Sequence, residues 1–207
     1  MLRTYTDHDF PACAEIINQV WDFDRKFPPQ PLSDLFKQMY IGVSLAASNF
    51  CVVMEEDGRV VGFLFGKCGD DHLVRNEYSG MWGGVKFLYR LLALQGVPLK
   101  KKLYYARIIG VHEKNRRAVE PTRVNEANLL AVDPRIQGKG YGKALMNAYI
   151  AHCKTLQVTR ITLETDKECN YGFFQHFGFT IKGTFYSPLQ QEYSGTSGES
   201  YVYELKL

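Results

Sequence analysis

Hydrophobic and polar positions follow two different periods along the first 66 residues. Residues 2–6 alternate as a strand does, whereas apolar residues between 10 and 21, and again between 35 and 40, recur at helical spacing. A proline-rich turn separates the two helical stretches, and the second helix is predicted to begin near Ser33. The chain therefore opens with a strand and two helices.

A hairpin is predicted next, because two β-rich runs, 50–54 and 60–65, flank the dipeptide Asp57-Gly58. From residue 127 onward the pattern is regular again. Its predicted elements are a strand at 127–132, a glycine-rich loop at 137–142, a helix at 143–156, a strand at 160–164, a short helix at 170–177 ended by Gly178, and strands at 179–185 and 201–207.

The stretch between these two regular parts, residues 67–125, is irregular. Its apolar residues from 87 to 94 predict one helix, which fits a core element or a lid. The charged runs at 100–102 and 113–117 are interpreted as solvated faces. With no repeat, linker or low-complexity tract, residues 1–207 are predicted to form one domain, with 67–125 as an insertion before the central strand.

Composition narrows the function classes. A hydrophobic content of 45% is enough for one sizeable core, and a net charge of +3 does not indicate nucleic-acid binding. The five cysteines are scattered without CxxC spacing, so free thiols are expected, with no metal site and no disulfide scaffold. No apolar run is long enough for a membrane span, and the N-terminus has no signal core. We expect a soluble, cytoplasmic protein.

The loop at 137–142 carries the clearest chemical signal. Glycines at 138, 140 and 142 let a bulky anion approach the backbone and permit positive φ angles. The helix that follows presents unpaired N–H groups and the positive end of its dipole, which together favour a pyrophosphate. Lys139 and Lys143 add positive charge at the rim.

Two other phosphate-binding motifs fit this loop poorly. A Walker A loop requires Ser or Thr after Gly-Lys, but Ala144 follows Gly142-Lys143. In the dinucleotide motif GxGxxG the third glycine comes one residue later than Gly142. Nucleotide hydrolysis and NAD chemistry are therefore disfavoured, while a purely structural turn stays an alternative.

The loop resembles the (Gln/Arg)-x-x-Gly-x-(Gly/Ala) motif of the GNAT N-acetyltransferases through Gln137, Gly140 and Gly142. The surroundings agree: Leu-Ala-Val-Asp-Pro precedes the loop and a helix follows it. Further on, Asn170 and the sequence Phe-Phe-Gln-His-Phe-Gly-Phe at 173–179 resemble a later motif of the family. The resemblance covers about residues 1–66 and 126–207 and leaves the insertion unexplained.

This resemblance implies the acyl-CoA N-acyltransferase fold, an α/β (α+β) arrangement with a mixed, mostly antiparallel sheet of about seven strands and helices on both faces. It implies acetyl-CoA as co-substrate, with its pantetheine beside the strand ending at Val132 and its pyrophosphate on the glycine loop. The residues predicted to contact acetyl-CoA are Leu130, Ala131, Val132, Gln137, Gly138, Lys139, Gly140, Tyr141, Gly142, Lys143, Asn170 and Phe174.

An attacking amine must lose a proton, because an amine of pKa near ~10.4 is mostly protonated at neutral pH. Glu126 is the first candidate base: counting by twos from Val132 places it on the same strand face, and many relatives carry glutamate there. A solvated strand-end carboxylate is the alternative. Glu164 is a second candidate, and Tyr105 and His112 are candidates for lining the acceptor site.

The sequence departs from the family at the residue expected to protonate the leaving thiolate. Phe174 occupies the position where relatives have tyrosine, and phenylalanine has no proton to give. Tyr171, a solvent-relayed proton or the acidity of the CoA thiol itself are the possible substitutes. Cys169 is interpreted as a small structural thiol rather than a nucleophile, since no histidine base is placed beside it.

The leading function is transfer of acetyl from acetyl-CoA to a primary amine, on a small molecule or peptide, by direct attack in a ternary complex. The alternative is a catalytically silent acyl-CoA-binding or regulatory module, and a nucleic-acid-binding protein is a third, weaker reading. Acceptor choice is expected in residues 21–43, 67–125 and 186–200. A homodimer is a further expectation.

Overall fold

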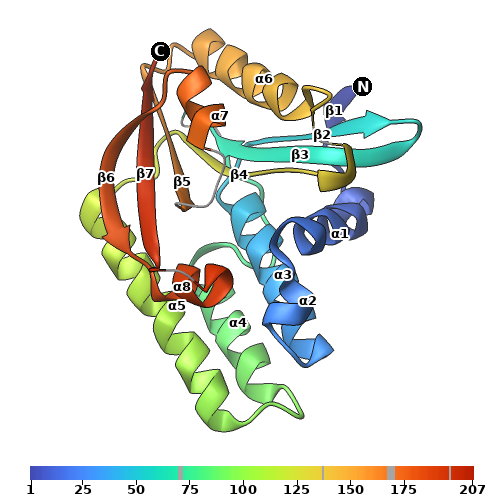
Figure 1. The fold of residues 1–207 in the computed structure, drawn as a ribbon, viewed down its shortest axis with the longest axis vertical. Helices are drawn as coiled ribbons and strands as arrows, with labels where there is room; N and C mark the ends of the chain where they lie inside the picture. The colour runs from blue at the N-terminus through green and yellow to red at the C-terminus, as the bar shows by residue number, and fades with distance from the viewer. Residues whose placement is uncertain (70–71, 137, 167–170, 196) are drawn as a thin grey trace.

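A computed structural model describes residues 1–69, 72–136, 138–166, 171–195 and 197–207. Its centre is a seven-stranded sheet in the order β1-β2-β3-β4-β5-β7-β6 (Figure 1). The strands are β1 (Leu2–Thr4), β2 (Phe50–Glu56), β3 (Arg59–Lys67), β4 (Glu126–Val132), β5 (Arg160–Asp166), β6 (Thr180–Tyr186) and β7 (Glu199–Lys206). Only β4 and β5 pair in parallel; the other neighbours in the described sheet are antiparallel. The predicted mixed, mostly antiparallel sheet is confirmed.

Helices cover both faces of this sheet, as predicted. They are α1 (Phe10–Trp21), α2 (Phe23–Lys26), α3 (Gln30–Ala46), α4 (Gly80–Ala93), α5 (Leu99–Val119), α6 (Tyr141–Thr155), α7 (Tyr171–His176) and α8 (Pro188–Ser194), with 3₁₀ turns at Asp7–Asp9 and Pro134–Ile136. Helices α1 to α5 share one buried hydrophobic cluster with the sheet, and α6 and α7 share another. Figure 1 shows α6 and α7 on one side of the central strands and α1, α2 and α3 on the other.

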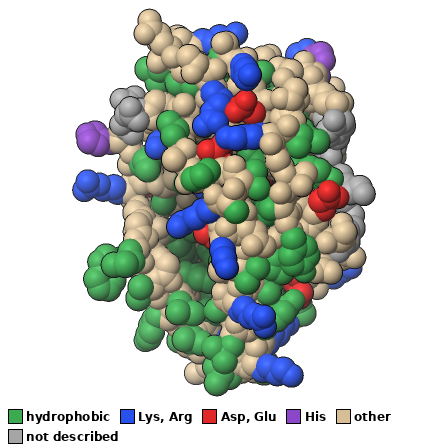
Figure 2. Space-filling model, turned by 90° about the vertical axis from the view of Figure 1, so that its left-hand side faces the viewer, with side chains coloured by type: hydrophobic (Ala, Val, Ile, Leu, Met, Phe, Trp, Pro, Cys, Tyr) green, Lys and Arg blue, Asp and Glu red, His purple; other side chains and the backbone are tan. Residues whose placement is uncertain are grey.

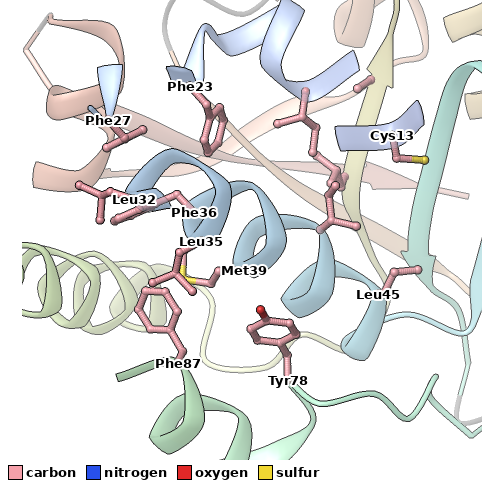
Figure 3. Packing of buried hydrophobic residues seen from close by; sticks show 14 of the residues in the cluster. Cys13, Phe23, Phe27, Leu32, Leu35, Phe36, Met39, Leu45, Tyr78 and Phe87 are labelled. Carbon is pink, nitrogen blue, oxygen red and sulfur yellow. The ribbon is translucent and has the colours of Figure 1, made fainter. Parts of the chain in front are cut away.

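Aromatic rings in the first cluster join the N-terminal helices to the insertion (Figure 3). Phe27 stacks on Phe36 with ring centroids 4.5 Å apart, and Phe36 meets Tyr105 of α5 edge-on at 5.0 Å. Phe87 of α4 contacts the other edge of this group at 6.1 Å from Phe36. The insertion is therefore part of the same core as α2 and α3.

Local sequence signals explain most of the element ends. α3 begins at Gln30, three residues before the predicted Ser33, because Pro31 is tolerated in the first turn of a helix. The hairpin turn predicted at Asp57-Gly58 is confirmed, with positive φ at both residues. Gly178 ends α7 with φ 88°, as the predicted C-cap requires.

The insertion differs most from the sequence-based expectation. It forms two helices rather than one, and Figure 1 shows them side by side below the sheet, with the C-terminal part of α5 lying beside β6. The charged runs at 100–102 and 113–117 are not simply solvated. Lys102 is buried and donates to the carbonyls of Leu92 and Leu94 at the end of α4, and Arg116 is fully buried. Both cations stabilise tertiary contacts of the hairpin.

The outer surface of this hairpin is unusually apolar. Met81, Trp82 and Tyr89 of α4 are more than two thirds exposed, at 80%, 76% and 71%. In Figure 2 hydrophobic side chains gather at the lower end of the view, where the α4–α5 hairpin lies. Among the described residues, no helix has both the length and the apolarity needed to cross a membrane.

One expectation about the cysteines is wrong. Cys68, just after β3, and Cys153, in α6, form a disulfide with Cα atoms 5.6 Å apart. Packing of α6 against the sheet brings these two distant positions together, which the sequence spacing of 85 residues does not indicate. Cys13 and Cys51 are free thiols, as expected.

Candidate active site

A forked pair of strands creates the main cleft. β4 and β5 are paired at Glu126↔Thr162 and Ala127↔Leu163, and both strands continue beyond these pairs. A cleft of about 640 Å³ opens next to the diverging strands. Its described lining residues are Val20, Trp21, Lys26, Leu130, Ala131, Val132, Ile136, Gly138, Gly140, Tyr141, Gly142, Lys143, Asp166, Phe173, Phe174, Gln190 and Ser194.

A β-bulge in β4 lies at the base of this fork. Phe65 pairs with Leu129 while Gly66 pairs with Ala127, which leaves Asn128 as an extra residue. The Asn128 side-chain amide donates to the carbonyl oxygen of Ala47 and to Oγ of Ser48, each at 2.9 Å. The amide thereby ties the bulge to the end of α3.

Because of the bulge, the Glu126 side chain lies on a different face of the sheet from the one that the sequence predicted. The extra residue shifts the alternation of side chains, so Glu126 does not share a face with Leu130 and Val132. Those two residues pack with the cluster around α6, whereas Glu126 contacts Arg116 of α5. Counting by twos from Val132 is therefore wrong for the face, while the catalytic role of Glu126 remains a prediction.

The glycine loop has the backbone that its sequence predicts. Gly138 and Gly140 have φ angles of 91° and 82°, and a Cβ at either position would meet open space. Gly140 is the N-cap of α6, so the first N–H groups of that helix have no partner within the helix. Together with the exposed position of the loop, this arrangement fits a bulky anion. Gln137 lies outside the described residues.

The two lysines of the loop are each held by a neighbour. Nζ of Lys139 lies 2.9 Å from Oε1 of Glu56 in β2, and the Tyr141 hydroxyl also donates to Glu56. Nζ of Lys143 lies 3.1 Å from Nε2 of His176 in α7. Lys143 lines the cleft, so its charge remains available to an anion there. Lys139 is engaged mainly with the β2–β3 hairpin.

The structure describes only part of the later motif, which comprises Asn170 and residues 173–179. Phe174 lines the cleft and is buried, with its ring 5.2 Å from that of Phe173 and 6.0 Å from that of Phe179. Its position leaves no hydroxyl at the point where relatives are expected to have one. Tyr171 is the first residue of α7, while Asn170 and Cys169 lie outside the described residues.

A buried ion-pair cluster lies at the apex of the fork. Nη2 of Arg116 donates to Oε2 of Glu126 at 2.6 Å, and Nε donates to Oε2 of Glu164 at 3.2 Å. The Arg116 side chain is 0% exposed, that of Glu126 3% and that of Glu164 24%. Burial raises the pKa of Glu126, and the nearby cations Arg123 and Arg116 oppose this shift.

His112 extends the cluster toward α8. Its Nε2 lies 3.5 Å from Oε1 of Glu164, and its Nδ1 lies 2.9 Å from Oγ of Ser187. Both His112 and Arg116 come from the insertion helix α5, one turn apart. Tyr105, two turns earlier, is buried in the aromatic cluster and is not among the described lining residues of the cleft.

Sequence reasoning missed Arg116 as a residue of this buried ion-pair cluster. His112 and Arg116 are four residues apart, which places them on one helical face. The charged residues around Arg116, however, led to the interpretation of this run as a solvent-exposed face. Trp21, Lys26, Gln190 and Ser194 line the cleft from two of the segments in which acceptor choice was expected. Among the described residues, no group of three potential metal ligands is present.

Comparisons with known proteins agree with this geometry. The family model described as "Acetyltransferase (GNAT) family" matches residues 12–179. No curated protein sequence matches the chain.

Solved structures similar to this chain include Ard1 and two N-acetyltransferases. Ard1 from Thermoplasma volcanium is 18% identical with a TM-score of 0.54, covering 100% of this chain and 97% of that one. An N-acetyltransferase from Staphylococcus aureus is 16% identical with a TM-score of 0.53, covering 100% and 97%. The ribosomal-protein-alanine N-acetyltransferase from Brucella melitensis is 15% identical with a TM-score of 0.55, covering 100% and 99%. At these identities the likeness establishes a shared fold.

Proposed function

This chain belongs to the acetyltransferase (GNAT) family, and from that premise we propose that it transfers acetyl from acetyl-CoA to a primary amine. The proposal rests on one observation: a single cleft is lined both by the diverging strands β4 and β5 and by the glycine loop. An elongated thioester fits such a cleft when its phosphates meet α6 and its acyl end reaches the fork. The acceptor is a small-molecule or peptide amine.

The β4 edge and the loop would hold the co-substrate. The strand from Leu130 to Val132 lines the cleft beyond the last pair with β5, so its backbone is in position to pair with pantetheine. Gly138, Gly140 and Gly142 admit the pyrophosphate to the helix N-terminus, and Lys143 adds positive charge. Asn170 is proposed to contact the same molecule, as in relatives.

Direct attack requires a neutral amine close to the thioester carbon. The acidic cluster of Glu126 and Glu164 at the apex of the fork supplies the carboxylates for deprotonation, which is typically worth ~10²–10⁴ in rate. Backbone N–H groups of β4 near the bulge would stabilise the negative charge that develops on the thioester oxygen.

The leaving group departs without a tyrosine at the usual place. Phe174 lines the cleft with an apolar ring, so the CoA sulfur leaves as a thiolate and takes its proton from solvent or from Tyr171. A thiol pKa near ~8.5 makes this departure feasible at neutral pH. The absence of this acid is also the observation that favours the alternative, a silent acyl-CoA-binding module.

Calorimetric titration with acetyl-CoA tests the binding half of the proposal. Gly140→Glu places a carboxylate at the N-cap of α6, where it repels the pyrophosphate, and we expect at least a ~100-fold loss of affinity. Gly96→Glu is the matched control, because Gly96 has a similar φ of 74° and equally open surroundings away from the cleft. Wild-type affinity in Gly140→Glu would contradict the loop assignment.

A further inference from the structure

The insertion helix α5 binds two carboxylates that come from the neighbouring strands β4 and β5. Arg116 donates through Nη2 to Glu126 of β4 at 2.6 Å and through Nε to Glu164 of β5 at 3.2 Å. Its Nη1 donates to the backbone carbonyl of Glu120 at 3.1 Å. One buried guanidinium therefore fixes the distance between the two strands where they diverge.

The two carboxylates differ in access. The Glu126 side chain is 3% exposed and its Oε2 is held by Arg116, whereas the Glu164 side chain is 24% exposed. Glu164 is the first β5 residue beyond the last pair with β4, and Asp166, two residues further on the same strand face, lines the cleft. Neither carboxylate is among the described lining residues of the cleft, but Glu164 is the more exposed of the two and shares its strand face with Asp166, which lines it.

His112 is oriented toward Glu164 by a buried serine. Oγ of Ser187 accepts the backbone N–H of Gln190 at 2.9 Å and has a second lone pair for Nδ1–H of His112, also at 2.9 Å. In that tautomer Nε2 of the ring faces Oε1 of Glu164 at 3.5 Å. A proton that reaches Glu164 can therefore be shared with the imidazole.

We propose that Glu164 removes the proton from the attacking amine, and that His112 and Arg116 of the insertion are positioning residues for it. The inference rests on the proposed acetyl transfer and assigns the base to β5 instead of to Glu126. Glu126 then serves to hold Arg116. The 67–125 insertion thereby becomes part of the catalytic apparatus.

The proton and electron balance is simple. The ammonium form of the acceptor gives one proton to the Glu164 carboxylate, and the resulting amine attacks the thioester carbon to form a C–N bond. The nitrogen then loses a second proton as the C–S bond breaks with its electron pair on sulfur. The thiolate takes up one proton, and the other leaves to solvent, so the products are the amide and free CoA.

The charged groups around Glu164 come from several elements. Arg116 and His112 face it from α5, and Glu126 lies across Arg116 on β4, with Arg123 3.9 Å from Glu126. Asp166 lies on the same face of β5. On β7 the nearest charge on this face is that of Glu204, which binds Arg160 at 3.1 Å. On the α8 side the polar partner is the neutral Ser187.

The test compares pH profiles of kcat/KM for the wild type and four glutamine variants, with acetyl-CoA affinity measured in each. We expect Glu164→Gln to lower kcat/KM by ~10²–10⁴ at neutral pH. The loss should become smaller as the pH approaches the pKa of the acceptor amine, because more of the amine is then already neutral. Glu126→Gln keeps the shape of the wild-type profile. Glu204→Gln is the matched control on the same sheet face and keeps both rate and profile. His112→Gln gives a partial loss, smaller than that of Glu164→Gln.

Either a wild-type profile in Glu164→Gln, or loss of the profile in Glu126→Gln alone, would overturn the assignment. A wild type that acetylates no amine would instead contradict the proposed function. The contact between His112 and Glu164 can still be tested without turnover, by NMR. The ¹⁵N chemical shifts of the His112 ring should change in Glu164→Gln and not in Glu204→Gln. Unchanged ring shifts in Glu164→Gln would show that the two side chains do not interact, and would overturn the inference.

Discussion

Replacing Arg116 by methionine should expose how strongly the buried ion pair contributes to the fold. Arg116 is 0% exposed and lies 2.6 Å from Glu126, whose side chain is 3% exposed. Removing one partner of such a pair leaves an uncompensated buried charge, which typically costs about 3–5 kcal/mol. Because domains are typically stable by about 5–15 kcal/mol, Arg116→Met should lower the free energy of unfolding by a large fraction.

The loss should depend on pH. Burial raises the pKa of Glu126 above its ordinary value of 4.5, and without Arg116 the nearest remaining cation is Arg123, 3.9 Å away and partly exposed. A raised folded-state pKa means that the folded protein holds the proton more tightly than the unfolded chain does. The protonated carboxyl is tolerated, so the deficit is smallest near pH 4.5 and grows as the pH rises through the folded-state pKa.

Urea unfolding at pH 5 and pH 8 measures this effect in Arg116→Met, Glu126→Gln and the double variant. The double variant contains no buried charge at this pair, so it should be more stable than Arg116→Met, with a coupling of at least about 1 kcal/mol. A deficit below about 1 kcal/mol at pH 8, or a double variant no more stable than Arg116→Met, would refute the reasoning.

Three other changes test separate parts of the account. Asp9, held by Arg3 at 2.7 Å, has its pKa lowered to about 2, so Asp9→Asn should cost about 1–2 kcal/mol at pH 7 in urea unfolding. This cost should fade as the pH drops from 3.8 toward 2, and a constant cost would argue against the ion pair. Phe174→Tyr should change kcat by no more than a few-fold, because the thiolate already leaves unaided at a thiol pKa near ~8.5; a rise above about tenfold in steady-state assays would mean that leaving-group protonation is limiting. Gly66→Ala should lower stability by about 1–3 kcal/mol, since its Cβ would lie 2.6 Å from the Tyr149 ring, and an unchanged melting temperature would show that the ring moves freely.

Much of the fold follows from short-range signals in the sequence. The glycine loop was predictable because Gly138 and Gly140 adopt positive φ angles that few other residues tolerate. The hairpin at Asp57-Gly58 and the end of α7 at Gly178 were predictable for the same reason. These positions are governed by local backbone sterics, which a single sequence records directly.

The apex of the fork was less predictable, because its features depend on tertiary contacts. Asn128 forms a bulge by binding the end of α3, which lies 80 residues away, and this bulge moved Glu126 to the other face. Arg116 lies in a charged run typical of a solvent-exposed helix. Its burial is explained by its ion pairs with Glu126 of β4 and Glu164 of β5, which the sequence around Arg116 does not indicate. α8 was missed because its seven residues are too few to show a helical period.

Acetyl transfer itself is the central claim, and one measurement tests it most directly. Wild-type protein is incubated with acetyl-CoA labelled in the acetyl group and with a panel of polyamines, amino acids and peptides, and both free CoA and acetylated amines are quantified by mass spectrometry. The account predicts that at least one amine gains the label with equal release of CoA, and that Gly140→Glu abolishes the transfer while Gly96→Glu does not. Tight binding of acetyl-CoA without transfer to any amine, at neutral or alkaline pH, would contradict the account and favour a silent acyl-CoA-binding module.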